Sequence, residues 1–531
     1  MGQWTEALVR SLVKVKPKAS EFKNLLCFLL EFMQHGHTAI PLQDEVLRRW
    51  VEVINDEGQN SFSLESILSE LDKLRSQTTA LEPYLIIEEG HLVWGLDKFK
   101  ENQIACLLKE KLNNTSSLED FYSTQTSDEQ DQALLKMKRA PVLTLVGGPG
   151  TGKSHVIFRF LESLSEKDRQ ECAVVAPTGR AASRLNEVLQ GLGVTAKTVH
   201  NLLRLYPKYG VELSYHSVNN PLPYQLVIVD ETSMLDQDLF LALVSAMTTQ
   251  ARLILVGDEH QLPSVLNGAI LRDIVDFFQK DPERKKHYLA ELKTNRRILE
   301  SEKAKQLANL FQEIRDFGSG SELPNFDAIQ HVQEFNRDKL LDEYAEHWKQ
   351  KINHLPNDPQ DLDRWLKDVV LLLPLRRGDW GIEKIQIDLK RRLKPAQNFF
   401  EGMPLMVRSN QPALGLSNGD RGQLRLDGGR WEVIFPQSNM MKLKRVPLSQ
   451  IQDYEDGFAL TIHKSQGSEF DKVVLVIPEG SELMMSKELL YTAVTRTKKE
   501  LVLYASNEIL KKCLENQFSR HTLLSTRLRS R

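Results

Sequence analysis

The sequence predicts an α/β protein built from two domains with parallel sheets, and two observations support this fold class. Between residues 130 and 275, short apolar runs alternate with helical stretches, as expected of a parallel sheet covered by helices on both faces. A second region of the same kind begins near residue 285. The expected strands are residues 142–146, 173–176, 226–229 and 253–256 in the first region and residues 369–373, 473–477 and 501–504 in the second.

The composition is that of an ordinary globular protein with several domains. The 531 residues suffice for three or four domains, and 41% of them are hydrophobic and 27% charged. A net charge of −3 gives no general basic field, so any nucleic-acid site should be a local groove. The four scattered cysteines argue against a zinc site or disulfide framework and suit a reducing compartment. Because we find no signal-peptide pattern and no membrane-length apolar run, we expect a cytoplasmic protein without membrane contact.

Residues 1–115 are expected to form a mostly helical N-terminal docking module. Large apolar residues recur there at three-to-four spacing, the period of an amphipathic helix. A hairpin is predicted at residues 84–87 and 91–94, around a Glu-Glu-Gly turn. Nothing in this module has catalytic spacing. Residues 113–131, rich in Ser, Thr, Asn and Asp, are the predicted linker to the next domain.

The first parallel-sheet domain, residues 125–284, begins with a phosphate-binding motif. Residues 147–154 read Gly-Gly-Pro-Gly-Thr-Gly-Lys-Ser, between a predicted strand and a predicted helix. A turn without bulky side chains lets backbone N–H groups face phosphate oxygens, and the helix N-terminus adds a partial positive charge. In this pattern Lys153 reaches the β- and γ-phosphates and the Ser154 hydroxyl binds Mg²⁺. The strand before the motif and the helix after it disfavour an accidental match.

Polar motifs also follow the other strands of this domain, at the sheet edge where ligands bind in such folds. Asp230 is placed to hold Mg²⁺ through water, and Glu231 to orient and deprotonate the attacking water. An isolated Asp-Glu pair is more often a solvated turn, but this pair follows a buried-strand pattern. Gln261 is a candidate contact to the γ-phosphate or else an ordinary loop residue. Residues 203–225 are predicted to form a small insert rich in tyrosine.

The second parallel-sheet domain is expected to comprise residues 285–399 and 456–531. Between these parts, residues 400–455 hold short β runs separated by Gly, Asn and Asp turns. This spacing predicts a small antiparallel β-barrel inserted into the domain. Residues 520–531 are basic and are expected to be frayed.

These motifs together resemble one family, in the family's order. The chain is similar to superfamily 1 DNA helicases and, within them, to the RecD type, the alpha subunit of exodeoxyribonuclease V. The resemblance covers roughly residues 125–505, and the N-terminal module matches more weakly, in length and helical character. The motifs are residues 147–154 (GGPGTGKS), 176–182 (APTGRAA), 229–234 (VDETSM), 257–265 (GDEHQLPSV), 375–381 (LRRGDWG), 413–420 (ALGLSNGD), 460–470 (LTIHKSQGSEF) and 490–497 (LYTAVTRT).

The resemblance implies two RecA-like domains that hold one ATP between them, with Mg²⁺. Where the family usually carries an aromatic residue that stacks on adenine, this chain has Arg296, whose guanidinium plane can also stack. Two arginines of the second domain, Arg297 and Arg496, are expected to stabilise the charge of the transferring phosphoryl group. The implied catalytic residues are Lys153, Glu231, Gln261, Arg297 and Arg496; the implied metal ligands are Ser154 and Asp230; and the implied nucleotide contacts are Gln130, Gly147, Gly148, Pro149, Gly150, Thr151, Gly152, Lys153, Ser154, Arg296 and Glu469.

Single-stranded DNA is expected to cross both domains, held by its phosphates and sugars. Hydroxyl groups and backbone N–H groups suit a motor, since they hold a strand without reading its bases. Two of the candidates are histidines that alternatively have a structural role. The positions that match the family's DNA contacts are Thr178, Thr198, His200, Asn418, Thr461 and His463.

Three functions remain open from the sequence. The first is an ATP-dependent DNA translocase and helicase, moving five-prime to three-prime on single-stranded DNA and unwinding double-stranded DNA. By resemblance it acts with RecB-like and RecC-like subunits, as the RecD subunit of a heterotrimeric exodeoxyribonuclease V in double-strand break repair and recombination. The second is a regulatory subunit that binds ATP without unwinding. The third is a free-standing RecD-like or conjugative helicase. We find no carboxylate cluster with nuclease spacing and expect no intrinsic nuclease activity.

Overall fold

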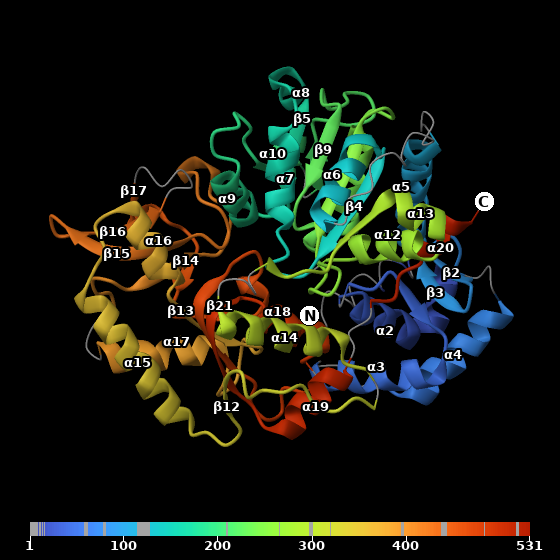
Figure 1. Cartoon of the computed structure of the whole chain (residues 1–531). Helices are drawn as coiled ribbons and strands as arrows, with labels where there is room; N and C mark the ends of the chain where they lie inside the picture. The colour runs from blue at the N-terminus through green and yellow to red at the C-terminus, as the bar shows by residue number, and fades with distance from the viewer. Residues whose placement is uncertain are drawn as a thin grey trace.

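The computed structural model describes residues 16–530 together with Val9, Leu12 and Lys14, apart from residues 35, 58–61, 78–80, 114–127, 209–210, 265, 297–300, 319, 395–397, 437–442, 483 and 517–519. Arg297 and most of the predicted linker therefore lie outside the described residues. In Figure 1 the first parallel sheet lies at the top, the second below it, an antiparallel sheet at the left and the N-terminal helices at the lower right.

The first sheet is parallel and has the strand order β11-β4-β10-β9-β5-β6. The predicted strands are present as β4 (Val142–Gly147), β5 (Cys172–Ala176), β9 (Leu226–Val229) and β10 (Arg252–Gly257). Two short strands were not expected, β6 (Lys197–Thr198) and β11 (Leu289–Leu292). The predicted boundary at residue 284 was wrong, because β11 lies beyond it and pairs with β4 of the first domain.

Helices and one hairpin complete the first domain. The insert predicted near residues 203–225 contains the antiparallel pair β7 (Leu205–Lys208) and β8 (Val211–Ser214). The helices are α6 (Glu129–Arg139), α7 (Lys153–Glu162), α8 (Glu166–Gln170), α9 (Gly179–Val188), α10 (Val199–Leu203), α11 (Gln237–Ala246), α12 (Ile270–Gln279) and α13 (Pro282–Tyr288).

The second sheet is also parallel, in the order β12-β21-β20-β13-β19. Its central strands β13 (Val369–Leu373), β20 (Phe470–Val476) and β21 (Thr497–Tyr504) were predicted, whereas the three-residue strands β12 (Gln330–Val332) and β19 (Ala459–Thr461) were not. Two parallel sheets fit the two RecA-like domains that the resemblance implies. The associated helices are α14 (Glu302–Asp316), α15 (Arg337–Asn353), α16 (Pro359–Lys367), α17 (Ile382–Leu393), α18 (Lys487–Val494) and α19 (Asn507–Glu515).

An antiparallel sheet is inserted between β13 and β19. Its strands are β14 (Pro404–Val407), β15 (Arg421–Asp427), β16 (Arg430–Pro436), β17 (Leu443–Pro447) and β18 (Tyr454–Asp456), in the order β17-β16-β15-β14-β18. Within the described part of this insert, no pairing joins β17 to β18. Closure of the sheet into a barrel therefore stays a prediction.

The N-terminal module combines helices with a small sheet. Its helices are α2 (Lys23–Gln34), α3 (Asp44–Glu57) and α4 (Leu64–Ser76), and its antiparallel sheet joins β1 (Ala39–Pro41) to the predicted hairpin of β2 (Leu85–Glu88) and β3 (His91–Trp94). The next helix, α5 (Gly95–Asn113), contributes Ile104 and Leu108 to the core of the first domain. Helix α5 therefore belongs to both units and blurs the predicted boundary at residue 115. None of the described helices is long and apolar enough to cross a bilayer.

Residues 520–530, hereafter the strap, return to the first domain and contradict two expectations. They contain α20 (Leu524–Arg529), whose Leu524 and Leu528 are 0% and 2% exposed in the first domain's core. In Figure 1, α20 lies beside α5 and α12, far from α19. The prediction of a frayed end was wrong, because leucines alternate with the basic residues and anchor them. The assignment of these residues to the second domain was wrong for the same reason.

Candidate active site

The loop between β4 and α7 is shaped by glycine. Gly150 and Gly152 have φ angles of 77° and 89°, in a left-handed region that residues with a Cβ rarely adopt. A Cβ on Gly147 would lie 2.7 Å from the carbonyl oxygen of Leu292 on β11. Glycine is thus required both for the turns of the loop and for its close approach to the sheet.

Lys153 begins α7, and its ammonium group lies against the loop. Its Nζ donates hydrogen bonds to the carbonyl oxygens of Gly147 and Gly148, at 2.6 and 3.0 Å. The Thr151 hydroxyl donates to the same Gly148 carbonyl at 2.9 Å. These bonds hold a positive charge where the N-terminus of α7 already favours anions.

Asp230 and Glu231 follow β9, at the edge of the sheet. Asp230 is 8% exposed, and its Oδ1 accepts a hydrogen bond from the backbone N–H of Glu231 at 2.9 Å. Burial raises the pKa of Asp230 to about 6, and the Glu231 charge adds to this rise while Lys153 opposes it. Glu231 has a φ of 52°, which costs a non-glycine residue about 1–3 kcal/mol. Such strain is typical of side chains that function must aim in one direction.

The loop after β10 forms a polar joint with α18 of the second domain. Asp258 accepts hydrogen bonds from the Tyr491 hydroxyl at 3.1 Å and from Nε2 of Gln261 at 3.2 Å. The backbone N–H of Leu262 donates to the Thr492 hydroxyl at 3.0 Å. Burial and the nearby charge of Asp258 raise the pKa of Tyr491 well above its usual value, so its hydroxyl keeps its proton. We name Asp258, Gln261, Leu262, Tyr491 and Thr492 the joint.

Arg496 lies two residues after α18 and is 3% exposed. Its Nε donates to the Thr492 carbonyl at 3.0 Å and its Nη1 to the Ser468 carbonyl at 3.3 Å. Burial lowers the pKa of this guanidinium, while the carboxylates of Glu231 and Glu469 oppose the change. A desolvated, fixed arginine of the second domain is thus coupled to the carboxylates around the cavity.

Sequence reasoning missed Arg184, which links the domains on the other side of the site. Arg184 on α9 pairs with Glu469 of the second domain at 3.0 Å. Burial alone would lower the pKa of Arg184, but the carboxylates of Glu469, Glu231 and Asp230 raise it above its usual value. The only sequence signal was its spacing of four residues from Arg180, which puts both on one helix face.

Side chains from both parallel-sheet domains line one cavity of about 320 Å³ between them. Lys153 and Arg496 thus face the same crevice from different domains. Arg184 and His155 line it without having been predicted. Of the predicted nucleotide-binding residues, Gly147, Gly148 and Thr151 belong to the loop but do not line the cavity. The predicted residues that do are Pro149, Gly150, Gly152, Lys153, Ser154, Asp230, Glu231, Gln261, Arg296, Glu469 and Arg496.

Two predicted adenine contacts are placed differently from each other. Gln130 is 2% exposed and lies behind the loop, where its Nε2 donates to the Thr151 carbonyl at 3.1 Å. Its Oε1 is buried and has no hydrogen-bond partner among the described residues. Arg296 lines the cavity, and its guanidinium pairs with Asp128 at 2.7 Å. Arg297, next to it, lies outside the described residues.

The donor set of the cavity fits a magnesium ion that keeps most of its water. Ser154 and Asp230 present hydroxyl and carboxylate oxygens to the same space. Mg²⁺ prefers oxygen ligands and usually takes only one or two carboxylates, together with water and substrate phosphates. No cluster of three or more His, Cys, Asp or Glu side chains that could hold a metal occurs in the described ranges. The site therefore fits an ion completed by a substrate rather than an ion caged by protein.

The predicted DNA contacts of the first domain lie at helix starts. The Thr178 and Thr198 hydroxyls cap α9 and α10, accepting hydrogen bonds from backbone N–H groups at 3.2 and 3.1 Å. His200 is half-buried on α10. A Cβ on Gly467 of the second domain would lie 3.9 Å from Thr178 Oγ1, so motifs of both domains approach each other here.

The remaining candidates lie in loops of the second domain. Thr461 ends β19, and its hydroxyl accepts from the backbone N–H of Lys464 at 3.3 Å. His463 follows and is exposed. Asn418 is exposed in a loop before β15, and the Ser417 side chain of that loop packs against Gly179 at the start of α9. These polar groups lie on both sides of the domain boundary.

Two protein families match parts of the chain. The family described as "AAA domain" matches residues 130–267, and the "UvrD-like helicase C-terminal domain" matches residues 456–504. The first match spans the loop between β4 and α7 and the joint residues that follow β10, and the second spans β19 to β21. Apart from Arg296, the residues that line the cavity fall within these two matched segments.

Curated proteins resemble the chain over most of its length. The RecBCD enzyme subunit RecD of Mycolicibacterium smegmatis is 31% identical, over 76% of this chain and 75% of that protein. The RecBCD enzyme subunit RecD of Mycobacterium tuberculosis is 30% identical, over 84% of this chain and 82% of that protein. The ATP-dependent RecD2 DNA helicase of Deinococcus radiodurans is 30% identical, over 70% of this chain and 48% of that protein. Among solved structures, a Bacteroides Pif1 helicase in complex with ADP-AlF3 and ssDNA is 19% identical with a TM-score of 0.41, over 72% of this chain and 92% of that one.

Proposed function

Because this chain belongs to the RecD family and is an ATP-dependent DNA helicase, we propose that the cavity between its two parallel-sheet domains is the ATPase site. One observation carries the proposal: Lys153 and Glu231 of the first domain and Arg496 of the second line the same cavity. A subunit that only bound ATP would not need a buried arginine from a second domain. The arrangement therefore favours hydrolysis over mere binding.

In the proposed reaction each charged group acts on a different part of the triphosphate. Lys153 exchanges its loop carbonyls for the β- and γ-phosphates, and Glu231 orients the attacking water and accepts its proton. Arg496 offers a planar donor to the charge that spreads over the equatorial oxygens of the transferring phosphoryl group. Mg²⁺, held by Ser154 and Asp230, would neutralise phosphate charge when bound.

The base of the nucleotide is proposed to lie near Arg296. Its guanidinium plane can stack on adenine, in place of the aromatic ring that the family usually has. Gln130 is the proposed reader of adenine. Its Oε1, which has no hydrogen-bond partner in the part of the chain that the structure describes, is the acceptor that an adenine amino group needs. Arg297 and Glu469 complete the proposed nucleotide contacts, with Arg297 as a second donor to the γ-phosphate.

Hydrolysis is proposed to drive movement through the joint. Gln261 contacts the γ-phosphate, and the same loop is hydrogen-bonded to α18, which leads to Arg496. Loss of the γ-phosphate removes the charge that holds Gln261 and Arg496 together, so the cleft can open. Thr178, Thr198, His200, Asn418, Thr461 and His463 are the proposed contacts that hold single-stranded DNA while the domains move, five-prime to three-prime.

We further propose that the chain works as the RecD subunit of a RecBCD-like heterotrimer in double-strand break repair, in the cytoplasm. The chain matches 75% and 82% of two RecD subunits but only 48% of the RecD2 helicase, which favours the subunit over the free-standing enzyme. The N-terminal module is the proposed docking site for the RecC-like subunit. Pull-down from native cells, followed by strand displacement with either overhang polarity, tests partners and direction together.

A Lys153→Gln variant tests the ATPase site directly. We expect DNA-stimulated ATP hydrolysis to fall about a thousandfold, because the charge that binds the β- and γ-phosphates is lost. Lys511→Gln, at a lysine that is 61% exposed on α19, is the matched control and should retain wild-type activity. Hydrolysis retained by Lys153→Gln would refute the assigned site.

A further inference from the structure

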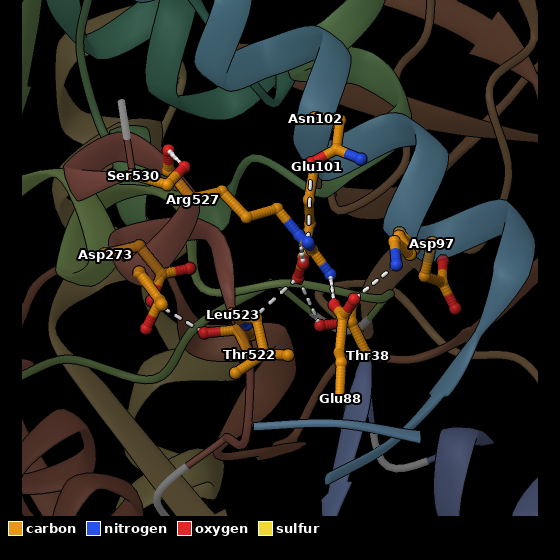
Figure 2. A network of polar contacts seen from close by, with 12 residues as sticks. Thr38, Glu88, Asp97, Glu101, Asn102, Asp273, Thr522, Leu523, Arg527 and Ser530 are labelled. Carbon is orange, nitrogen blue, oxygen red and sulfur yellow. Dashed lines mark hydrogen bonds and ion pairs between the residues drawn. The ribbon is translucent and has the colours of Figure 1, made fainter. Parts of the chain in front are cut away.

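The strap is firmly attached to both the first domain and the N-terminal module. Figure 2 shows the Thr522 hydroxyl donating to Asp273, at 2.6 Å, and the backbone N–H of Leu523 donating to Glu101, at 3.2 Å. Arg527 bonds to the same Glu101 at 2.8 Å and also to Glu88. The strap thus joins α12, α5 and β2, which lie far apart in the sequence.

Arg520 begins the strap and inserts its guanidinium into the loop that follows the joint. Its Nη1 donates to the carbonyl oxygens of Leu266 at 2.5 Å and Gly268 at 2.7 Å, and to the Ser264 hydroxyl at 3.3 Å. Its Nη2 donates to the Ser264 carbonyl. On the other side, a Cβ on Gly36 would lie only 2.3 Å from the Arg520 Cζ, so the N-terminal module covers this guanidinium.

The loop that Arg520 holds is continuous with the joint. Ser264 follows Leu262 by two residues, and Gln261 in turn lines the cavity. Leu262 is bonded to α18, while Ser264 is bonded to the strap. Because a planar guanidinium fixes several acceptors in one geometry, Ser264, Leu266 and Gly268 cannot shift independently of one another. The loop is therefore held at both ends by segments of the chain that come after it.

The same strap segment is bonded to the N-terminal module. The His521 carbonyl accepts hydrogen bonds from the backbone N–H groups of Thr38 and Ala39, both at 3.1 Å. The backbone N–H of His521 donates to Nδ1 of His37 at 3.0 Å. Arg520 and its neighbour thus connect the loop beside the cavity to the start of β1.

We propose that Arg520 is a positioning residue for ATP hydrolysis, which sets the place of Gln261 in the cavity by fixing Ser264, Leu266 and Gly268. The inference rests on the proposed ATPase site and adds to it a residue outside the cavity. It also gives the N-terminal module a route to the chemistry. A displacement of that module changes the rate of hydrolysis without any contact to ATP.

Steady-state ATPase measurements on the full chain with saturating single-stranded DNA test the proposal. We expect Arg520→Met to lower kcat about tenfold to hundredfold, as misplacement of a catalytic group does. KM for ATP should stay within about twofold, because the phosphate-binding loop is untouched. Arg520→Lys should recover part of kcat, since an ammonium group can reach some of the same carbonyls without the planar fork.

Arg527→Met is the matched control on the same strap. It removes the bonds to Glu101 and Glu88 but none of the bonds that hold Ser264, Leu266 and Gly268, which come from Arg520. We expect its kcat to stay within about twofold of wild type at a temperature where it is folded. Thermal unfolding of every variant separates loss of fold from loss of rate. If Arg520→Met does not fold, Arg520→Lys is the test variant. Its kcat should then be lower than that of wild type while its KM for ATP is unchanged.

A double-mutant cycle with Gln261→Ala identifies the route. If Arg520 acts through Gln261, the double variant should be no slower than the slower single variant, because the two residues act as one unit. If the losses in kcat of the two single variants multiply in the double variant, the inference is overturned. A wild-type kcat in a folded Arg520→Met variant would overturn it as well. Hydrolysis retained by Lys153→Gln would instead refute the ATPase site itself, whatever the Arg520 variants do.

Discussion

The joint and the strap both connect the first domain to later parts of the chain, but they are built differently. The joint consists of polar bonds such as those from Tyr491 to Asp258 and from Leu262 to Thr492, at 3.1 and 3.0 Å. The strap adds two buried leucines and an arginine paired with Glu101, which is 2% exposed. A single hydrogen bond contributes about 0.5–1.5 kcal/mol, whereas breaking a buried ion pair costs about 3–5 kcal/mol. The contrast teaches that the joint is suited to open in each cycle and the strap to stay closed.

The two regions also differ in their titrating groups. Beside the cavity, burial raises the pKa of Asp230 to about 6, with a smaller contribution from Glu231. Beside the strap, burial raises the pKa of Asp273 to about 8, with a smaller contribution from Glu101 and against the hydrogen bond from Thr522. Above about pH 6, a rise in pH should therefore destabilise the strap region, through Asp273, more than the region of the cavity.

The largest effect is expected from Arg496→Ala, which removes the second domain's arginine from the cavity next to the joint. Removing an arginine that stabilises the transferring phosphoryl group lowers kcat about a thousandfold or more. The free energy of unfolding should change little by comparison. The measurement is DNA-stimulated ATP hydrolysis, with Lys499→Ala on β21, where the lysine is 74% exposed, as control. An Arg496→Ala enzyme with wild-type kcat would remove the proposed role of the second domain.

The next effect is expected from Arg527→Met, which weakens the attachment of the strap to α5 and β2. It leaves the buried Glu101 carboxylate without its main partner, at a cost of about 3–5 kcal/mol in stability. Chemical denaturation at neutral pH measures the loss, and Arg529→Met, at a more exposed position of the same helix, serves as control. A denaturation midpoint equal to that of the wild type would mean that the strap does not hold the fold.

A smaller effect is expected from Asp273→Asn, which changes how the stability of the strap region depends on pH. The pKa of this carboxyl is about 8 when folded and near its ordinary 3.8 when unfolded, so the folded state binds the proton more tightly. Stability therefore falls as pH rises between these values, by about 2 kcal/mol from pH 6 to pH 8. Asp273→Asn should flatten the fall of the thermal midpoint over this range. Asp427→Asn, at a carboxylate that is 66% exposed, should keep the wild-type slope.

The smallest effect is expected from Tyr491→Phe in the joint. The variant removes one hydrogen bond to Asp258, which keeps its bond from Gln261, so about 1 kcal/mol or roughly a fivefold change in rate is expected. The change should appear in kcat for DNA-stimulated ATPase, while thermal stability stays near that of wild type. A large loss of stability without loss of rate would reverse the roles assigned to the joint and the strap.

Local sequence predicted the cavity better than it predicted the edges of the domains. The cavity's main residues each belong to a contiguous motif next to a predicted strand or within a family motif. They are the loop at residues 147–154, the pair Asp230–Glu231 and Arg496. The pair of Arg184 and Glu469 was missed because its members are far apart in the sequence and meet only across the cleft. Strands β6 and β11 were missed because so few residues carry no clear period. The hydrogen bond from Gln130 to the Thr151 carbonyl was not expected either, because no motif specifies it, and the contact of Gln130 with adenine stays a prediction.

The boundaries failed for a related reason. Helix α5 and the strap have mixed apolar and charged residues that suit either a surface or an interface, and only tertiary packing decides between them. Composition near residue 520 indicated a solvated end, because basic residues outweigh the few leucines. Glu88 and Glu101, the acids that pair with Arg527, lie more than 400 positions earlier in the chain.

Helix α12 packs against the strap, which is synthesised long after α12 itself. Its Asp273 is bonded to Thr522, 249 positions further on, and the whole second domain is synthesised in between. The first domain therefore cannot finish packing while it emerges alone, although domains usually mature one after another during translation. Ribosome-bound chains that stop before residue 520 should expose the part of the first domain's core that Leu524 and Leu528 cover to chaperones and proteases until the remaining residues arrive.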